Sequence, residues 1–134
     1  MQVHTFLVLY AISVPLFFCI DMLWITVIAK RFYLSQIGYL MGDVVWLAAI
    51  SFYLLFLLGL TYFATYPAAT KGTVLTAVIM GGLFGFFTYA TYDLTNLATV
   101  RSWPLAITLV DMAWGTVLGA TVSGATILIR NLFV

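Results

Sequence analysis

The chain has 134 residues, of which 65% are hydrophobic and 7% charged, and its net charge is +1. A soluble domain has about 25% charged residues, so this chain carries too few charges to cover a soluble surface. The composition also excludes a disordered chain, which needs high charge, and a disulfide scaffold, because Cys19 is the only cysteine. The small net charge offers no electrostatic footprint for nucleic acid, so we expect no such partner. The solvent that remains is the lipid bilayer.

Four long apolar segments predict four membrane-spanning helices. They run from about Thr5 to Ala29, from Val44 to Tyr66, from Thr73 to Ala98 and from Pro104 to Ile129. A spanning helix needs roughly 20 mostly apolar residues, whereas barrel strands alternate between apolar and polar over roughly ten. Because the segments take up most of the chain, we expect one all-α membrane domain over residues 1–134, folded as a bundle of four transmembrane helices.

The connections carry ordinary boundary signals. We expect Tyr66-Pro67 to end the second span and Trp103-Pro104 to open the fourth, since proline suits the first position of a helix. The segment Lys30–Asp43 is the only sizeable loop. Its aromatic and apolar residues fit a short interfacial helix and a plain loop with interface anchors about equally well.

The charged residues are sorted by sign. All five basic residues lie outside the spans, whereas Asp21, Asp93 and Asp111 lie inside the first, third and fourth, and Asp43 opens the second. Because consecutive spans run in opposite directions, all four aspartates fall toward the same membrane face. The basic residues divide three against two between the faces, which is too close to decide the orientation by the positive-inside rule.

Three of these aspartates share a depth in the membrane. At 1.5 Å per residue, Asp21, Asp93 and Asp111 lie roughly 10–14 Å below one surface of a ~30 Å core. A carboxylate in a membrane helix costs roughly 2.5–3.5 kcal/mol on insertion, so three at matched depth favour a polar pocket inside the bundle. Such a pocket would take a cation, a proton or a polar head group. The alternative is that each aspartate is bonded to a neighbouring polar side chain and only fixes helix packing.

Other polar side chains lie in the same layer. On the third span, Tyr89 and Asn96 lie about one turn on either side of Asp93, and Tyr92 pairs with Asn96 in the same way. The segments 20–29 and 110–119 share an Asp-x-x-Trp spacing, which Asp43 and Trp46 repeat. We therefore assign the pocket to Asp21, Trp24, Tyr89, Tyr92, Asp93, Asn96, Asp111 and Trp114, with Arg101 as a counter-charge.

Small residues predict which helix faces pack together. Gly81 and Gly85 on the third span, and Gly115 and Gly119 on the fourth, are spaced by four residues, which lets helix backbones approach closely in lipid. Continued by one-turn steps, each stripe leads to the aspartate of its own helix. The packing faces and the acidic residues therefore share a side of each helix.

The residues that metals and cofactors prefer are scarce. His4 is the only histidine, and with Cys19 it cannot build a haem, zinc or thiolate site. An oxygen-only aspartate cluster would suit Mg²⁺, Ca²⁺ or Mn²⁺ better than softer metals, but we assign no metal ligand and expect no cofactor.

Several of these segments together resemble a known family. They are Asp21-x-x-Trp24, Phe32-Tyr33 with Gly38, the segment Tyr89–Asn96, Trp103-Pro104 and the segment Asp111–Gly115. This pattern resembles a family of small bacterial four-helix membrane proteins known only as domain of unknown function 2177. The resemblance implies a multi-pass protein of the bacterial cytoplasmic membrane and brings no activity, substrate or catalytic residue.

Three functions fit these residues. We favour the transport of a small solute, or transport coupled to protons or cations, and we expect a homo-oligomer because one such bundle is too small to enclose a large path. The second is a lipid-modifying enzyme with Asp93 and Asp111 as acid and base. The third is a structural or accessory subunit. The expected partners are the lipid bilayer and a small polar or cationic ligand, and whether the chain is an enzyme stays open.

Overall fold

The computed structural model describes residues 2–134, and no β-strand occurs among them. Four helices are long and apolar enough to cross a membrane: Val3–Ile28, Trp46–Lys71, Val74–Thr99 and Leu105–Asn131. The structure thus confirms the predicted all-α class and the four-helix bundle.

The four spans are not uniform helices. The first consists of α1 (Val3–Leu23) and the π-helical turn η1 (Trp24–Ile28), and the second of α3 (Trp46–Leu60), the π-helical turn η3 (Thr61–Thr65) and α4 (Tyr66–Lys71). The third and fourth are α5 (Val74–Thr99) and α6 (Leu105–Asn131). Between the first two spans lie α2 (Lys30–Ile37) and the 3₁₀ turn η2 (Gly38–Leu40), so this segment is a short helix rather than a plain loop.

The second span continues past the boundary expected from its proline. The helix runs through Tyr66-Pro67 as far as Lys71. A proline inside an α-helix lacks a backbone N–H, and its ring clashes with the carbonyl four residues earlier. The wider π turn η3 comes directly before Tyr66 and accommodates this misfit, so the chain stays helical beyond Pro67.

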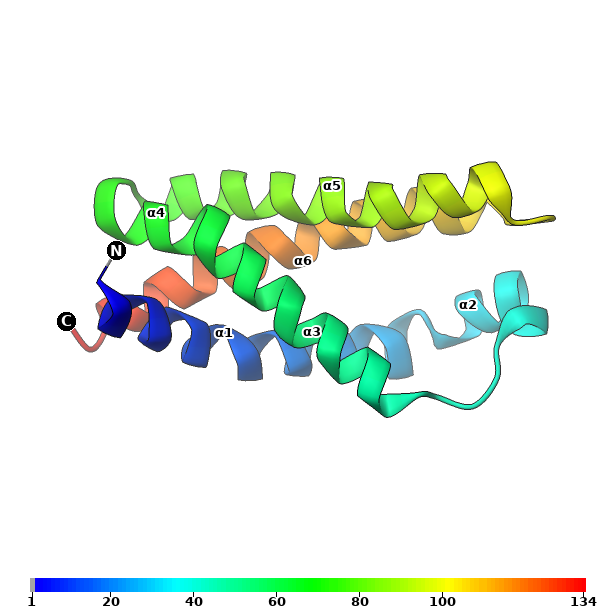
Figure 1. Ribbon diagram of the computed structural model, residues 1–134, viewed down its shortest axis with the longest axis horizontal. Helices are drawn as coiled ribbons and strands as arrows, with labels where there is room; N and C mark the ends of the chain where they lie inside the picture. The colour runs from blue at the N-terminus through cyan, green and yellow to red at the C-terminus, as the bar shows by residue number, and fades with distance from the viewer. Residues whose placement is uncertain (1) are drawn as a thin grey trace.

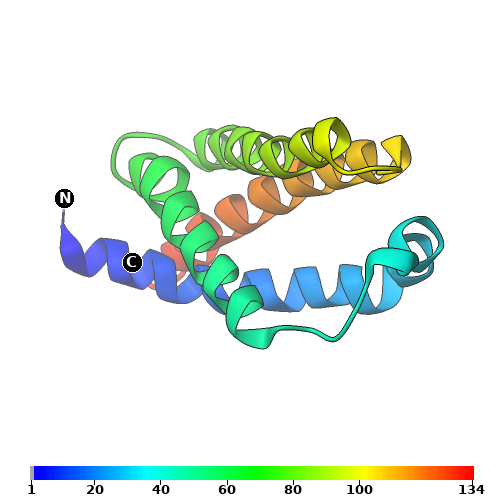
Figure 2. The ribbon, with the colours of Figure 1, turned by 45° about the vertical axis from the view of Figure 1, so that its right-hand side comes forward.

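The elements are arranged so that one end of the bundle is tight and the other is spread. In Figure 1, α5 and α6 lie side by side, both chain termini lie at one end, and α2 lies at the other. Figure 2 shows α3 crossing the bundle obliquely, with its first turns far from α5. An apolar core near the middle joins α1, α3 and α6, and it includes Phe17, Leu57 and Leu118, all fully buried.

The contact between α5 and α6 is one of backbone against backbone. A Cβ atom on Gly85 would collide with the carbonyl oxygen of Gly115, and one on Gly119 would collide with the carbonyl oxygen of Gly81. No side chain fits between the helices at these positions. In lipid, where apolar side chains gain little by leaving solvent, this close packing is the main attraction between helices.

This contact predicts a strong difference between two neighbouring glycines. Gly85→Ala should lower the free energy of unfolding by about 1–3 kcal/mol, because the new methyl group has no space against α6. The measurement is unfolding of the purified protein in dodecylmaltoside by added dodecyl sulfate, followed by circular dichroism.

Gly82→Ala is the matched control. A Cβ there would meet its nearest neighbour, the Cβ of Ala120, at 3.5 Å, which is ordinary van der Waals contact. Its free energy of unfolding should be no lower than that of the wild type, because the new methyl group fits and alanine is the better helix former. Equal destabilisation of the two variants would contradict the close α5–α6 contact.

Candidate functional site

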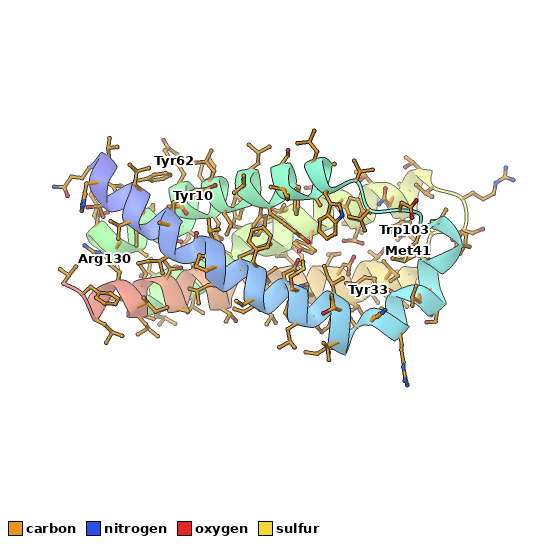
Figure 3. All side chains as sticks on the ribbon, turned by 90° about the horizontal axis from the view of Figure 1, so that it is seen from below. Tyr10, Tyr33, Met41, Tyr62, Trp103 and Arg130 are labelled. Atoms are coloured by element: carbon orange, nitrogen blue, oxygen red, sulfur yellow. The ribbon has the colours of Figure 1, made fainter. Side chains whose placement is uncertain are left out.

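A cavity of about 590 Å³ lies at the end of the bundle away from the termini. Its lining comes from α1 and η1, from α2, and from α3, α5 and α6. It occupies the region where α3 diverges from α5, because Ala49, Phe52 and Tyr53 line it from one side and Thr88 and Tyr89 from the other. Figure 3 shows two further lining residues, Tyr33 and Met41, at this end of the molecule.

The structure brings most of the predicted pocket residues to this cavity. Six of the eight line it: Asp21, Trp24, Tyr89, Tyr92, Asp111 and Trp114. Asp93 is fully buried, and its carboxyl group neighbours that of Asp111. Asn96 is half-buried and lies outside the lining. Arg101 is exposed in the turn between α5 and α6 and also lies outside the lining, so the structure does not place it beside the aspartates.

Two stacked indole rings connect the two Asp-x-x-Trp segments. The rings of Trp24 and Trp114 are nearly parallel, at 6°, and their centroids are 4.2 Å apart. Trp114 Nε1 donates a hydrogen bond of 3.1 Å to Asp21 Oδ1. The repeated spacing therefore has a structural role, because the tryptophan of the second segment donates to the aspartate of the first.

The second connection runs through a tyrosine of α2. Trp24 Nε1 donates a hydrogen bond of 3.1 Å to Tyr33 Oη, and the Tyr33 hydroxyl donates to Asp111 Oδ1. Burial and the neighbouring Asp111 carboxyl raise the pKa of Tyr33 above its usual range, so the phenol remains a donor at neutral pH. The third Asp-x-x-Trp spacing takes no part, since Asp43 and Trp46 are both exposed.

The segment that contains α2 and η2 covers the cavity at the end of the bundle. Besides the Tyr33 bond, Tyr39 Oη donates a hydrogen bond of 2.7 Å to the carbonyl oxygen of Ser102. Ser102 lies in the turn between α5 and α6 and has a positive φ of 61°. Two phenols thus attach this cover to the α5–α6 side of the bundle, one at each end of the segment.

Asp93 differs from the two aspartates in the lining. Its side chain has 0% exposure, and neither carboxyl oxygen receives a hydrogen bond from a donor group of residues 2–134, so the neighbouring Asp111 carboxyl can be its partner only when one of the two holds a proton. A buried polar group without a partner is expensive, and an ionised one far more so. Within the described residues, no group of three or more His, Cys, Asp or Glu side chains could hold a metal ion.

Among the lining residues that the sequence analysis missed, Tyr53, Tyr33 and Lys30 matter most, because their polar groups lie near the carboxyl groups or carry charge. Tyr53 lies beside Asp21, and its place within the otherwise apolar second span was a signal that we did not use. Tyr33 was noted only as an interface anchor and in the family pattern, and Lys30 only as a charge outside the spans. Both depend on the fold of α2, which the sequence left open between helix and loop.

Comparison with known proteins gives the family. Residues 6–128 match the family described as "Predicted membrane protein (DUF2177)". The chain belongs to this family. No curated protein and no solved structure matches it. Membership of DUF2177 confirms the resemblance carried by the sequence segments and agrees with the four apolar helices, while the description names neither a substrate nor a reaction.

The hydrogen bonds from Trp24 through Tyr33 to Asp111 predict that the stability of this DUF2177 protein depends on the hydroxyl group of Tyr33. Tyr33→Phe should lower the free energy of unfolding by about 1–3 kcal/mol, because it leaves Trp24 without an acceptor and the Asp111 carboxyl without its donor. The dodecyl sulfate titration described above measures the change. Tyr62→Phe serves as control, since Tyr62 is 55% exposed and lies outside this cavity. If both variants unfold alike, the Tyr33 bond does not hold α2 in place.

Proposed function

We propose that this protein is a small proton-coupled carrier that binds a cationic solute in the cavity. The observation that carries the proposal is the fully buried carboxyl group of Asp93, which receives no hydrogen bond from a donor group and lies next to the Asp111 carboxyl. If the aspartates only fixed helix packing, each would be expected to accept a hydrogen bond from a neighbouring donor, as Asp21 and Asp111 do, whereas the group beside Asp93 is a second carboxyl. Ionisable groups inside membrane helices are rare, often pair with one another, and mark ion and proton pathways.

The neighbouring carboxyl groups of Asp93 and Asp111 suggest how coupling works. Two negative charges side by side in a medium of low dielectric constant repel strongly, so the empty pair is cheapest when it holds a proton. A cation that enters the cavity supplies the same positive charge, and the proton can then leave to water. When the cation departs, a proton returns to the pair. One cation is exchanged for one proton, and the net charge of the site stays constant.

The rest of the cavity supports a cationic solute. The side chains of Trp24, Trp114 and Tyr89 line it, and aromatic rings attract cations. The cavity is open on the side where α3 diverges from α5, so a single bundle does not enclose a complete path.

The test is proton-coupled flux in proteoliposomes. Purified protein is reconstituted with a pH-sensitive dye inside the vesicles, and choline, tetramethylammonium and ethidium are added outside in turn. We expect at least one cation to drive proton movement in wild-type vesicles, and Asp93→Asn to abolish it because the amide cannot hold and release the proton. Asp43→Asn, which alters an exposed aspartate outside the cavity, should behave as the wild type.

Two results would contradict the carrier. One is the absence of any flux driven by a proton or cation gradient in vesicles shown to contain folded protein. The other is equal flux in wild-type and Asp93→Asn vesicles. Mass spectrometry of the vesicle lipids is run in parallel, and a new lipid species would favour the lipid-modifying enzyme instead.

A further inference from the structure

One side of the cavity, between α3 and α5, opens within the membrane-spanning helices. Phe52 on α3 is 43% exposed and Tyr92 on α5 is 57% exposed, and both line the cavity. Both belong to helices that are apolar enough to span the membrane. The side opening between α3 and α5 therefore faces the acyl chains of the bilayer, and its rim is aromatic.

The end nearer to water is less suited to a cation. There α2 and η2 cover the cavity, attached through Tyr33 and Tyr39. Lys30 lines the cavity at this end, and its side chain is exposed. A cation that arrives from water would meet a covering helix and a like charge, whereas one dissolved in the membrane would meet neither.

The inner wall combines carboxyl groups with an aromatic stack. Asp21 is 2% exposed and Asp111 8%, and both line the cavity beside the stacked rings of Trp24 and Trp114. A positive charge there is stabilised by the carboxyl groups and, when desolvated, by the indole faces. The cavity volume of about 590 Å³ lies within the range of sites for drug-sized ligands.

The order of charges along the cavity disfavours a phospholipid. Asp21 lies in α1 inside the first span, whereas Lys30 opens α2 beyond the end of that span, so the carboxyl group lies deeper in the membrane than the lysine. An aminophospholipid carries its ammonium group outside its phosphate, so its ammonium would meet Lys30 and its phosphate would meet the aspartates. A compact molecule with one positive charge and an apolar body avoids both mismatches.

We propose that the cavity takes a membrane-dissolved amphiphile with a single positive charge, which enters sideways between α3 and α5 and docks its cationic group against Asp21 and Asp111. This inference rests on the proposed carrier function and specifies its substrate class. An alkyl ammonium ion and a flat aromatic cation share this chemistry, and the two arms of the test distinguish them.

The test is equilibrium binding in phosphatidylcholine nanodiscs. The protein carries Trp46→Phe and Trp103→Phe, so that Trp24 and Trp114 are its remaining tryptophans and report on the cavity. Dodecylammonium and ethidium are the cationic probes, and dodecanol is the uncharged control with the same tail. We expect at least one cation to change the tryptophan emission with saturation, at a Kd at least about tenfold below that for dodecanol, as expected for loss of a charged hydrogen bond.

Variants separate binding in the cavity from simple partition into the bilayer. Asp21→Asn and Asp111→Asn should each raise the Kd for the cation by about tenfold or more, whereas Asp43→Asn should not change it. Lys30→Gln, which removes the like charge, should lower the Kd. Circular dichroism checks that each variant is folded, and Lys30→Gln keeps the test decisive if an aspartate variant does not fold.

A pair of alanines on α3 tests the side entrance. Ala49 lines the cavity, and its neighbour Ala48 is exposed outside it. Ala49→Phe should fill the opening and raise the Kd by about tenfold or more, whereas Ala48→Phe, facing lipid, should leave it unchanged.

The outcomes separate this inference from the carrier proposal. The substrate class would be overturned by equal affinity for dodecanol, or by wild-type affinity in both aspartate variants. It would also be overturned if phosphatidylethanolamine nanodiscs abolished cation binding, because the aminophospholipid would then be the ligand that occupies the cavity. Saturable cation binding without proton-coupled flux would support the cavity assignment and contradict the carrier. Flux of choline without binding of either amphiphile would support the carrier and overturn the assignment.

Discussion

The backbone contact between α5 and α6 is the constraint on which the site depends. Because Gly85 and Gly115 have no side chains, the two helices touch along their glycine stripes. This closeness sets Asp93 against Asp111 one or two turns further on. It also makes room for Tyr89, whose ring occupies the space that a Cβ on Gly115 would need. The same glycines that hold the pair together thus shape one wall of the cavity.

A second constraint concerns the cost of carboxyl groups in a membrane. The fold meets it by a crosswise exchange, in which Trp114 donates to Asp21, and Trp24 serves Asp111 through Tyr33. The stacked indoles fix both donors at once. Since Tyr33 comes from α2, the cover of the cavity and the hydrogen bonding of Asp111 depend on the same contact, and displacement of α2 would leave that carboxyl group without its phenol donor.

The sequence predicted the fold and much of the pocket because both rest on local periodicity. Spans of sufficient length and glycines four residues apart follow from helical geometry, and so does the common depth of Asp21, Asp93 and Asp111. The rest depends on contacts that no local pattern encodes. One example is the π turn η3, which lets the helix continue past Pro67. Another is the position of α2, which brings Tyr33 and Lys30 to the cavity. Arg101 was chosen for its proximity along the chain, whereas the cation that folds back to the cavity is Lys30.

The three buried aspartates now have different roles in one arrangement. Asp21 and Asp111 are oriented by donors and present themselves to the cavity, while Asp93 has no donor and no exposure. A fold that only needed to neutralise its carboxyl groups could have placed a threonine or leucine at position 93, at lower cost in lipid. A carboxyl group that no donor reaches, placed against a second carboxyl group, is what the proposed exchange of a proton requires. Under the carrier proposal, the aromatic rim of the same cavity would admit the amphiphilic cation that is exchanged for that proton.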